Sequence, residues 1–226
     1  MESQSANTDN TCTSNRETVV LYHGLGRTKY SMLPLVLRLR AGGFRVINIG
    51  YPSRRHTIER LAGILHEKLE LSPVDSPGPL HFVTHSMGGI LLRRYLKDHP
   101  EIRVGRVVML APPNSGSELV DFFGRTVLLR LIYGPAGCQL GTSATSAPNT
   151  LGPVDFELGV IAGNRTWNPL YSALIPGPDD GKVAVDRCRV EGMKDFTVVP
   201  HSHGFIMNSR RVAELVVNFL RHREFG

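Results

Sequence analysis

The chain reads Thr84-His85-Ser86-Met87-Gly88-Gly89 directly after an apolar run at residues 80–83. A segment with helical periodicity follows at 90–96. This order predicts a buried strand, a sharp turn that carries Ser86, and then a helix. Such a turn holds its serine in a strained backbone conformation and projects the hydroxyl from the end of a sheet. It requires small residues two before and two after the serine. Gly88 meets this requirement, and Thr84 is a modest departure from the usual glycine.

Apolar runs and amphipathic segments alternate along the rest of the chain. Strands are predicted at 18–22, 44–49, 80–84, 104–110, 156–162 and 196–199, and helices at 32–40, 58–71, 87–99 and 210–221. Most of the strands are nearly continuous in apolar residues, which is typical of strands buried on both faces. The alternation predicts an α/β fold with a mostly parallel sheet of about six strands and helices on both faces. We expect Thr57 to cap the second helix, and either Asn208 or Ser209 to cap the last.

Length and composition favour one domain. The chain has 226 residues, of which 41% are apolar and 20% charged, ordinary values for a globular protein. We expect a disordered polar tail over 1–16 and a single domain over 17–226. Residues 122–153 interrupt the alternation and predict an insertion above the carboxyl ends of the strands, as a pocket wall or a small lid. The tail carries no signal pattern and no apolar run is long enough to cross a bilayer, so we expect a cytoplasmic protein without a transmembrane segment.

Charge and cysteine content exclude several classes of function. The net charge is +6, but the arginines are scattered and no basic run is interleaved with aromatic residues, so we expect no nucleic-acid partner. Cys12, Cys138 and Cys188 are far apart and show no zinc spacing. At most one disulfide is expected from three cysteines. The oligomeric state does not follow from these features.

A serine hydroxyl is a weak nucleophile and needs a base that a carboxylate orients. The base is expected after the last strand, where His203 is favoured over His201 because it lies further into the turn toward the last helix. The carboxylate is expected on the loop before that strand. Asp180 is preferred there, since a flexible glycine and an anchoring valine follow it, and Asp179 is the alternative.

The reaction of such a serine also needs donors for a developing oxyanion. One donor is expected to be the backbone N–H of Met87, the residue after the serine. The other is expected from the loop after the first strand, where the chain reads His23-Gly24-Leu25-Gly26. The N–H of Leu25 is the natural choice, because the flanking glycines allow the backbone to approach a substrate closely.

Five segments together carry a resemblance to a known family: 21–26, 84–89, 110–117, 179–183 and 202–207. The sequence resembles the α/β-hydrolase superfamily and, within it, small bacterial lipases and esterases. The resemblance implies a serine esterase, with Ser86 as nucleophile, Asp180 as acid and His203 as base. It also implies an oxyanion hole at the N–H groups of Leu25 and Met87.

Two features depart from the family pattern. Thr84 replaces a smaller residue, and the acid follows its strand only after a loop at 165–178. The expected substrate is a small-molecule ester or a lipid, with a preference for small or medium acyl chains, and no cofactor or metal is expected. Thioester or amide hydrolysis and acyl transfer remain alternatives with the same residues, and a non-catalytic binding protein is a further one.

Other interpretations of single motifs are weaker. The segment 24–29 has two of the glycines of a dinucleotide loop but lacks the third. The histidines do not form a metal-binding motif. Arg27, Arg54 and Arg55 are predicted on loops near the strand ends, where one of them would attract an anionic group of a substrate. The apolar residues just before the acid, at 167–174, are candidates for an acyl pocket.

Overall fold

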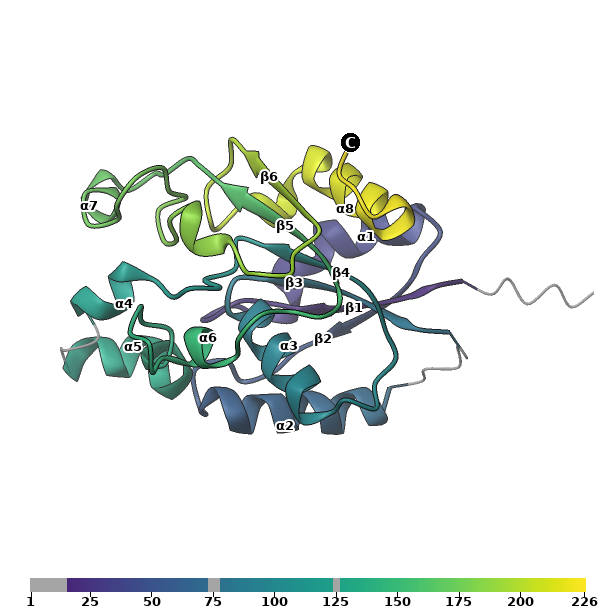
Figure 1. The fold of residues 1–226 in the computed structure, drawn as a ribbon, viewed down its shortest axis with the longest axis horizontal. Coiled ribbons are helices and arrows are strands. Elements are labelled where there is room, and N and C mark those ends of the chain that lie inside the picture. Colours follow the sequence, from purple (N-terminus) through teal and green to yellow (C-terminus); the bar gives the residue numbers. More distant parts are fainter. Residues whose placement is uncertain (1–15, 73–77, 124–126) are drawn as a thin grey trace, which may run out of the picture.

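The structure, a computed structural model, describes residues 16–72, 78–123 and 127–226. Its centre is one six-stranded sheet with the order β2-β1-β3-β4-β5-β6, in which every neighbouring pair is parallel (Figure 1). The strands are β1 (Thr18–Tyr22), β2 (Arg45–Ile49), β3 (Leu80–His85), β4 (Val104–Leu110), β5 (Glu157–Gly163) and β6 (Asp195–Val199). The predicted parallel sheet of about six strands is confirmed. The predicted tail over 1–16 lies, except for Arg16, outside the described residues.

Helices cover both faces of the sheet, as predicted. On one face lie α1 (Leu33–Ala41) and α8 (Arg210–His222), and on the other lie α2 (Ile58–Glu70) and α3 (Met87–Asp98) (Figure 1). Alternate residues of β1 divide between the two cores: Val19 and Leu21 pack with α1 and α8, whereas Val20 and Tyr22 pack with α2 and α3. Because both faces are buried, these strands read as continuous apolar runs.

The ends of the helices follow from local chemistry. The Thr57 hydroxyl oxygen accepts a hydrogen bond from the Arg60 N–H at 3.4 Å and caps α2. The Ser209 hydroxyl oxygen accepts one from the Val212 N–H at 3.3 Å, so Ser209 rather than Asn208 caps α8. These bonds satisfy N–H groups that the first turn of a helix leaves unpaired.

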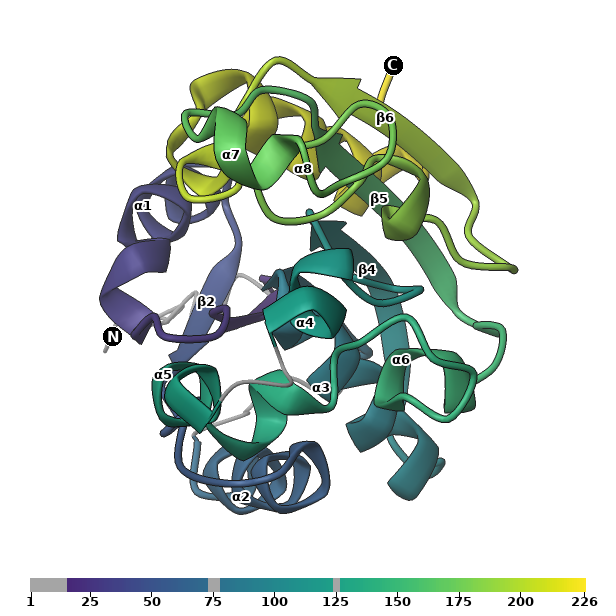
Figure 2. The ribbon, with the colours of Figure 1, turned by 90° about the vertical axis from the view of Figure 1, so that its left-hand side faces the viewer.

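Short elements gather beyond the carboxyl ends of the strands. Here lie α4 (Glu118–Phe123), α5 (Val127–Cys138) and α7 (Pro169–Ser172) (Figure 1), and Figure 2 looks onto this end of the molecule. The remaining short elements are α6 (Ala147–Thr150) and three 3₁₀ turns at Lys29–Met32, Asp186–Cys188 and Ile206–Asn208. The chain bends within α5 at Gly134, where φ is 66°. A Cβ there would lie 1.9 Å from the Arg54 carbonyl oxygen, so the bend requires glycine.

Candidate active site

Ser86 occupies the turn between β3 and α3. Its backbone has φ 54° and ψ −127°, outside the regions that residues with side chains favour. Its N–H donates to the Leu110 carbonyl oxygen at 2.8 Å, which holds the turn against β4. The turn therefore fixes the strained conformation that projects the hydroxyl above the sheet.

Gly88 allows this turn to form. A Cβ at Gly88 would lie 2.8 Å from the carbonyl oxygen of Tyr22 and 2.9 Å from that of His23. The close approach at Gly88 is thus to the end of β1, while the Thr84 hydroxyl lies 3.3 Å from the position of a Cβ at Gly89. The first turn of α3 therefore packs directly against backbone atoms, and no movement of a side chain would make room for a larger residue in place of Gly88.

A continuous chain of hydrogen bonds joins Ser86, His203 and Asp180. The His203 Nε2 lies 2.9 Å from the Ser86 hydroxyl oxygen, and its Nδ1 lies 2.7 Å from an Asp180 carboxylate oxygen. All three residues are buried. Because the carboxylate only accepts, Nδ1 carries the hydrogen and donates to Asp180, and the free lone pair of Nε2 faces the serine hydroxyl. The structure thus brings together three residues that lie far apart in the sequence.

Asp180, rather than Asp179, contacts the imidazole. The other carboxylate oxygen of Asp180 accepts hydrogen bonds from the N–H groups of Lys182 at 3.0 Å and Val183 at 2.9 Å. The Asp179 carboxylate turns away from the histidine and accepts from the Gly181 N–H at 2.7 Å and from the Ser172 hydroxyl. The two neighbouring acids therefore have different structural tasks, one toward His203 and one toward α7.

His85 supports the loop that carries His203. Its ring is buried, and its Nε2–H donates to the His203 carbonyl oxygen at 2.9 Å. Burial and the nearby His203 lower the pKa of His85 well below its usual value of 6.5. His85 is therefore neutral near pH 7 and donates one hydrogen bond to the loop of His203.

The N–H groups of Leu25 and Met87 are free for an acceptor from outside the chain. Met87 is the first residue of α3, where a helix leaves its N–H groups unpaired. Among the described residues, neither N–H donates to another group. Leu25 lines the same cavity as Ser86. This arrangement is compatible with the predicted oxyanion hole, whose role stays a prediction.

Residues after β2 hold the loop that contains Leu25. Tyr51 stacks on His23 with ring centroids 4.1 Å apart, and its hydroxyl donates to the His23 carbonyl oxygen. The Ser53 hydroxyl oxygen accepts from the Gly26 N–H at 3.0 Å. Tyr51 and Ser53 are not among the residues predicted from the sequence. Their signal was available, because β2 and β1 are adjacent parallel strands and the residues that follow them meet at the same edge.

A cavity of about 90 Å³ adjoins Ser86 and His203. Its apolar lining includes Leu25, Leu119, Val120, Tyr133, Leu140 and Val183, and its charged lining consists of Arg27 and Lys182. Tyr133 and Leu140, which lie within the predicted insertion at 122–153, line this cavity, and the role of the segment as a pocket wall or a lid stays a prediction. The apolar residues at 167–174 do not line the cavity. Trp167 is 84% exposed and Leu170 77% exposed, because α7 points outward from the sheet.

No candidate metal centre is present in residues 16–72, 78–123 and 127–226. Histidine, cysteine, aspartate and glutamate side chains nowhere gather there in groups of three that would suit a metal ion. Cys138 and Cys188 are unpaired, and Cys12 lies outside the described residues. No helix in this part of the chain has the length and apolarity that a membrane span needs.

The comparison with family models agrees with this fold. The model of the Alpha/beta hydrolase family matches residues 19–215, nearly the whole chain. The protein belongs to the alpha/beta hydrolase family. The expected membership is thereby confirmed. No curated protein matches this chain in sequence.

Solved structures similar to this chain include lipases and a phospholipase. The mature form of the Bacillus licheniformis lipase BlEst2 matches with a TM-score of 0.65 and 18% identity, over 93% of both chains. The propeptide form of that lipase gives a TM-score of 0.71, but this chain spans only 50% of its length. The phospholipase PlaB from Legionella pneumophila gives 0.71 at 18% identity, over 92% of this chain and 60% of that one. At such identities the similarity shows a common fold.

Proposed function

We propose that this hydrolase cleaves carboxylic esters through a covalent acyl-enzyme on Ser86. The observation that carries the proposal is the hydrogen-bonded chain from Ser86 through His203 to Asp180, placed at a strained turn beside a cavity. A serine, an imidazole and a buried carboxylate in this order are the parts that activate a hydroxyl for acyl transfer. The lipase structures of the same fold agree with this chemistry.

The first half of the reaction forms the acyl-enzyme. The Ser86 oxygen attacks the ester carbonyl carbon while the His203 Nε2 takes its proton. Asp180 stabilises the resulting imidazolium through Nδ1. The N–H groups of Leu25 and Met87 donate to the oxyanion of the tetrahedral intermediate. When this intermediate collapses, His203 gives its proton to the leaving alkoxide and an alcohol departs.

The second half of the reaction regenerates the free enzyme. His203 takes a proton from water, and the oxygen of that water attacks the acyl carbon. A second tetrahedral intermediate forms at the same N–H groups. Its collapse releases a carboxylic acid, and the Ser86 oxygen recovers its proton from Nε2. The reaction requires no cofactor.

The cavity supports substrates with small or medium acyl chains. Its volume of about 90 Å³ is well below the roughly 300–1,000 Å³ of pockets that enclose drug-sized ligands. The apolar lining by Leu25, Leu119 and Leu140 suits a short alkyl group. We therefore propose butyrate-like esters as the first substrates to assay.

Replacement of the nucleophile tests the proposal. In Ser86→Ala we expect turnover of p-nitrophenyl butyrate to fall by about 10⁴-fold or more, and labelling by a serine-directed phosphonate to be lost. The control is Ser143→Ala, which removes an exposed serine outside the cavity. Turnover that persists in Ser86→Ala and equals that of the control would show that the mechanism is wrong.

Matched ester, thioester and amide substrates with one acyl group test the reaction type. We expect the ester to have the highest kcat/KM, and acyl transfer to added alcohol or amine acceptors to remain minor. A strong preference for the amide would contradict the proposal.

A further inference from the structure

Two cationic side chains border the cavity of Ser86, and the mechanism above uses neither. Arg27 follows the loop that carries Leu25, and Lys182 lies two residues after Asp180. Across the described part of the chain, no carboxylate lies within 4 Å of either cation, whereas some other basic residues form ion pairs, such as that of Arg187 with Glu118 at 2.7 Å. Both residues are solvent-exposed, and what distinguishes them from other unpaired cations is that both line the cavity of Ser86.

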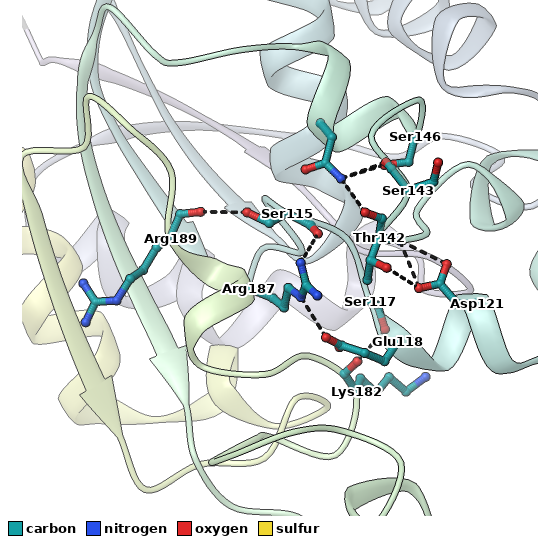
Figure 3. A network of polar contacts seen from close by, with 11 residues as sticks. Ser115, Ser117, Glu118, Asp121, Thr142, Ser143, Ser146, Lys182, Arg187 and Arg189 are labelled. Carbon is teal, nitrogen blue, oxygen red and sulfur yellow. Dashed lines mark hydrogen bonds and ion pairs between the residues drawn. The ribbon is translucent and has the colours of Figure 1, made fainter.

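Arg27 is held at the site by its side chain and Lys182 by its backbone. An Arg27 Nη2 donates to the Gly204 carbonyl oxygen at 3.3 Å. The Lys182 carbonyl oxygen accepts a hydrogen bond from the Ser117 hydroxyl at 2.8 Å. Figure 3 shows the ammonium group of Lys182 directed away from the polar contacts drawn there. That ammonium lies 5.8 Å from the centroid of the Tyr133 ring. The backbone of Lys182 is thus anchored while its charge remains available.

The network of Figure 3 fixes the backbone around Lys182 more widely. Arg187 bridges Glu118 on α4 and the Ser115 carbonyl oxygen, and Asp121 accepts from Thr142. These bonds join the loop after Asp180 to the loop after β4 and to the insertion. Lys182 therefore lies in a wall whose segments are joined by several hydrogen bonds.

The two charges disfavour each other in the free protein. Desolvation and then the charge of Arg27 lower the pKa of Lys182, against the opposite effect of Asp180. An anion beside both side chains would offset this repulsion. It would also replace water as the hydrogen-bond acceptor of both charged groups. The electrostatics of the cavity thus favour a negatively charged ligand.

We propose that Arg27 and Lys182 form an anion-binding subsite, and that the preferred substrates are esters whose alcohol portion carries a carboxylate or a phosphate. This inference rests on the proposed function. In that mechanism the leaving alcohol lies beside His203, which protonates it. Arg27 is bound to the residue that directly follows His203, so the cationic subsite lies on the side of the leaving group.

Matched esters of one acyl group test the subsite. The anionic substrates are butyryl glycolate, which carries a carboxylate, and 2-(butyryloxy)ethyl phosphate. The neutral partners are butyryl glycolamide and butyryl ethylene glycol. We expect kcat/KM to be higher for at least one anionic ester than for its neutral partner, mainly through KM, and the two pairs distinguish a carboxylate from a phosphate. Monoethyl succinate with ethyl pentanoate places the charge on the acyl side instead.

Variants assign the preference to the two side chains. In Arg27→Gln and in Lys182→Met we expect the ratio of kcat/KM for anionic over neutral ester to fall by about tenfold each, as for loss of a hydrogen bond to a charged group. Arg40→Gln and Lys194→Met remove the same charges from exposed positions outside the cavity and serve as controls. A ratio that is unchanged in the cavity variants, or that falls equally in the controls, would overturn the subsite. A preference only for the ester that carries its charge on the acyl side would overturn the placement of the subsite beside the leaving group.

Binding without turnover separates this inference from the proposed function. Calorimetry with inorganic phosphate is carried out on Ser86→Ala and on Ser86→Ala combined with Arg27→Gln. We expect phosphate to bind the first variant and to bind the second at least about tenfold more weakly. Equal binding overturns the subsite even where esters are hydrolysed. Specific binding with no ester turnover by the unmodified protein overturns the proposed function and leaves the subsite standing.

Discussion

Asp179 and Asp180 have the same chemistry and adjacent positions, yet only one contacts His203. The difference arises from backbone geometry: the Asp180 carboxylate is oriented by the N–H groups of Lys182 and Val183, and its own carbonyl oxygen accepts from the His203 N–H at 2.9 Å. These bonds leave one carboxylate oxygen toward the imidazole. The role of each acid is thus set by which backbone groups surround it.

This assignment predicts unequal effects of two conservative substitutions. In Asp180→Asn we expect kcat for ester hydrolysis to fall by about 10³–10⁴-fold, because the amide favours the wrong histidine tautomer. In Asp179→Asn, which is the matched control, we expect a change below about tenfold, since its contacts go to Gly181 and Ser172. Steady-state kinetics on a butyrate ester measures both. Equal, mild losses would mean that neither carboxylate orients the base.

At the scale of elements, the turn between β3 and α3 depends on how closely the helix approaches β1. The parallel register pairs Tyr22 with Thr84. This pairing brings the carbonyl oxygens of Tyr22 and His23, at the end of β1, against the first turn of α3. Only a residue without a side chain fits there. Gly63 in the middle of α2 differs, because a Cβ at that position would meet no atom within 4 Å.

The two helical glycines therefore predict opposite responses to alanine. We expect Gly88→Ala to destabilise the fold by about 1–3 kcal/mol, the usual cost of overpacking, and to reduce ester turnover through a shifted Ser86. We expect Gly63→Ala to stabilise it by about 0.5–1 kcal/mol through its higher helix propensity and lower unfolded-state entropy. Urea unfolding of both variants measures the free energies. A Gly88→Ala protein as stable and active as the original would contradict the geometry of this turn.

At the scale of the whole molecule, two buried histidines that are neutral near pH 7 lie at the end of the sheet that carries the site. Burial is the main cause that lowers the pKa of both His23 and His85. In the unfolded chain these histidines regain a pKa near 6.5. They therefore bind protons at a pH at which the folded protein keeps them neutral. As pH falls below about 6.5 the unfolded state therefore gains protons, and the free energy of unfolding decreases.

The expected slope is up to about 1.4 kcal/mol per pH unit for each such histidine. Urea unfolding between pH 5.5 and 8 measures it. We expect His85→Gln to reduce the loss of stability on acidification, and His222→Gln, which changes an exposed histidine at the end of α8, to leave it unchanged. The same slope in all three proteins would exclude His85 as a source of the pH dependence.

The sequence by itself determined the order of strands and helices and the membership of the alpha/beta hydrolase family. Periodicity and caps are local properties, so the six parallel strands and the helices on both faces were predictable from residues such as Thr57 and the run before Ser86. The turn motif and the order of serine, aspartate and histidine placed the candidate site at the carboxyl ends of the strands.

Only the tertiary structure decided how the loops at that edge meet. It oriented Asp180 rather than Asp179 toward His203, placed Tyr51 against His23, and brought Arg27 and Lys182 to one cavity. Each of these contacts joins segments that are distant in the chain or selects between adjacent residues of equal chemistry. Such choices depend on the register of parallel strands and on turn geometry, and a local sequence pattern contains neither.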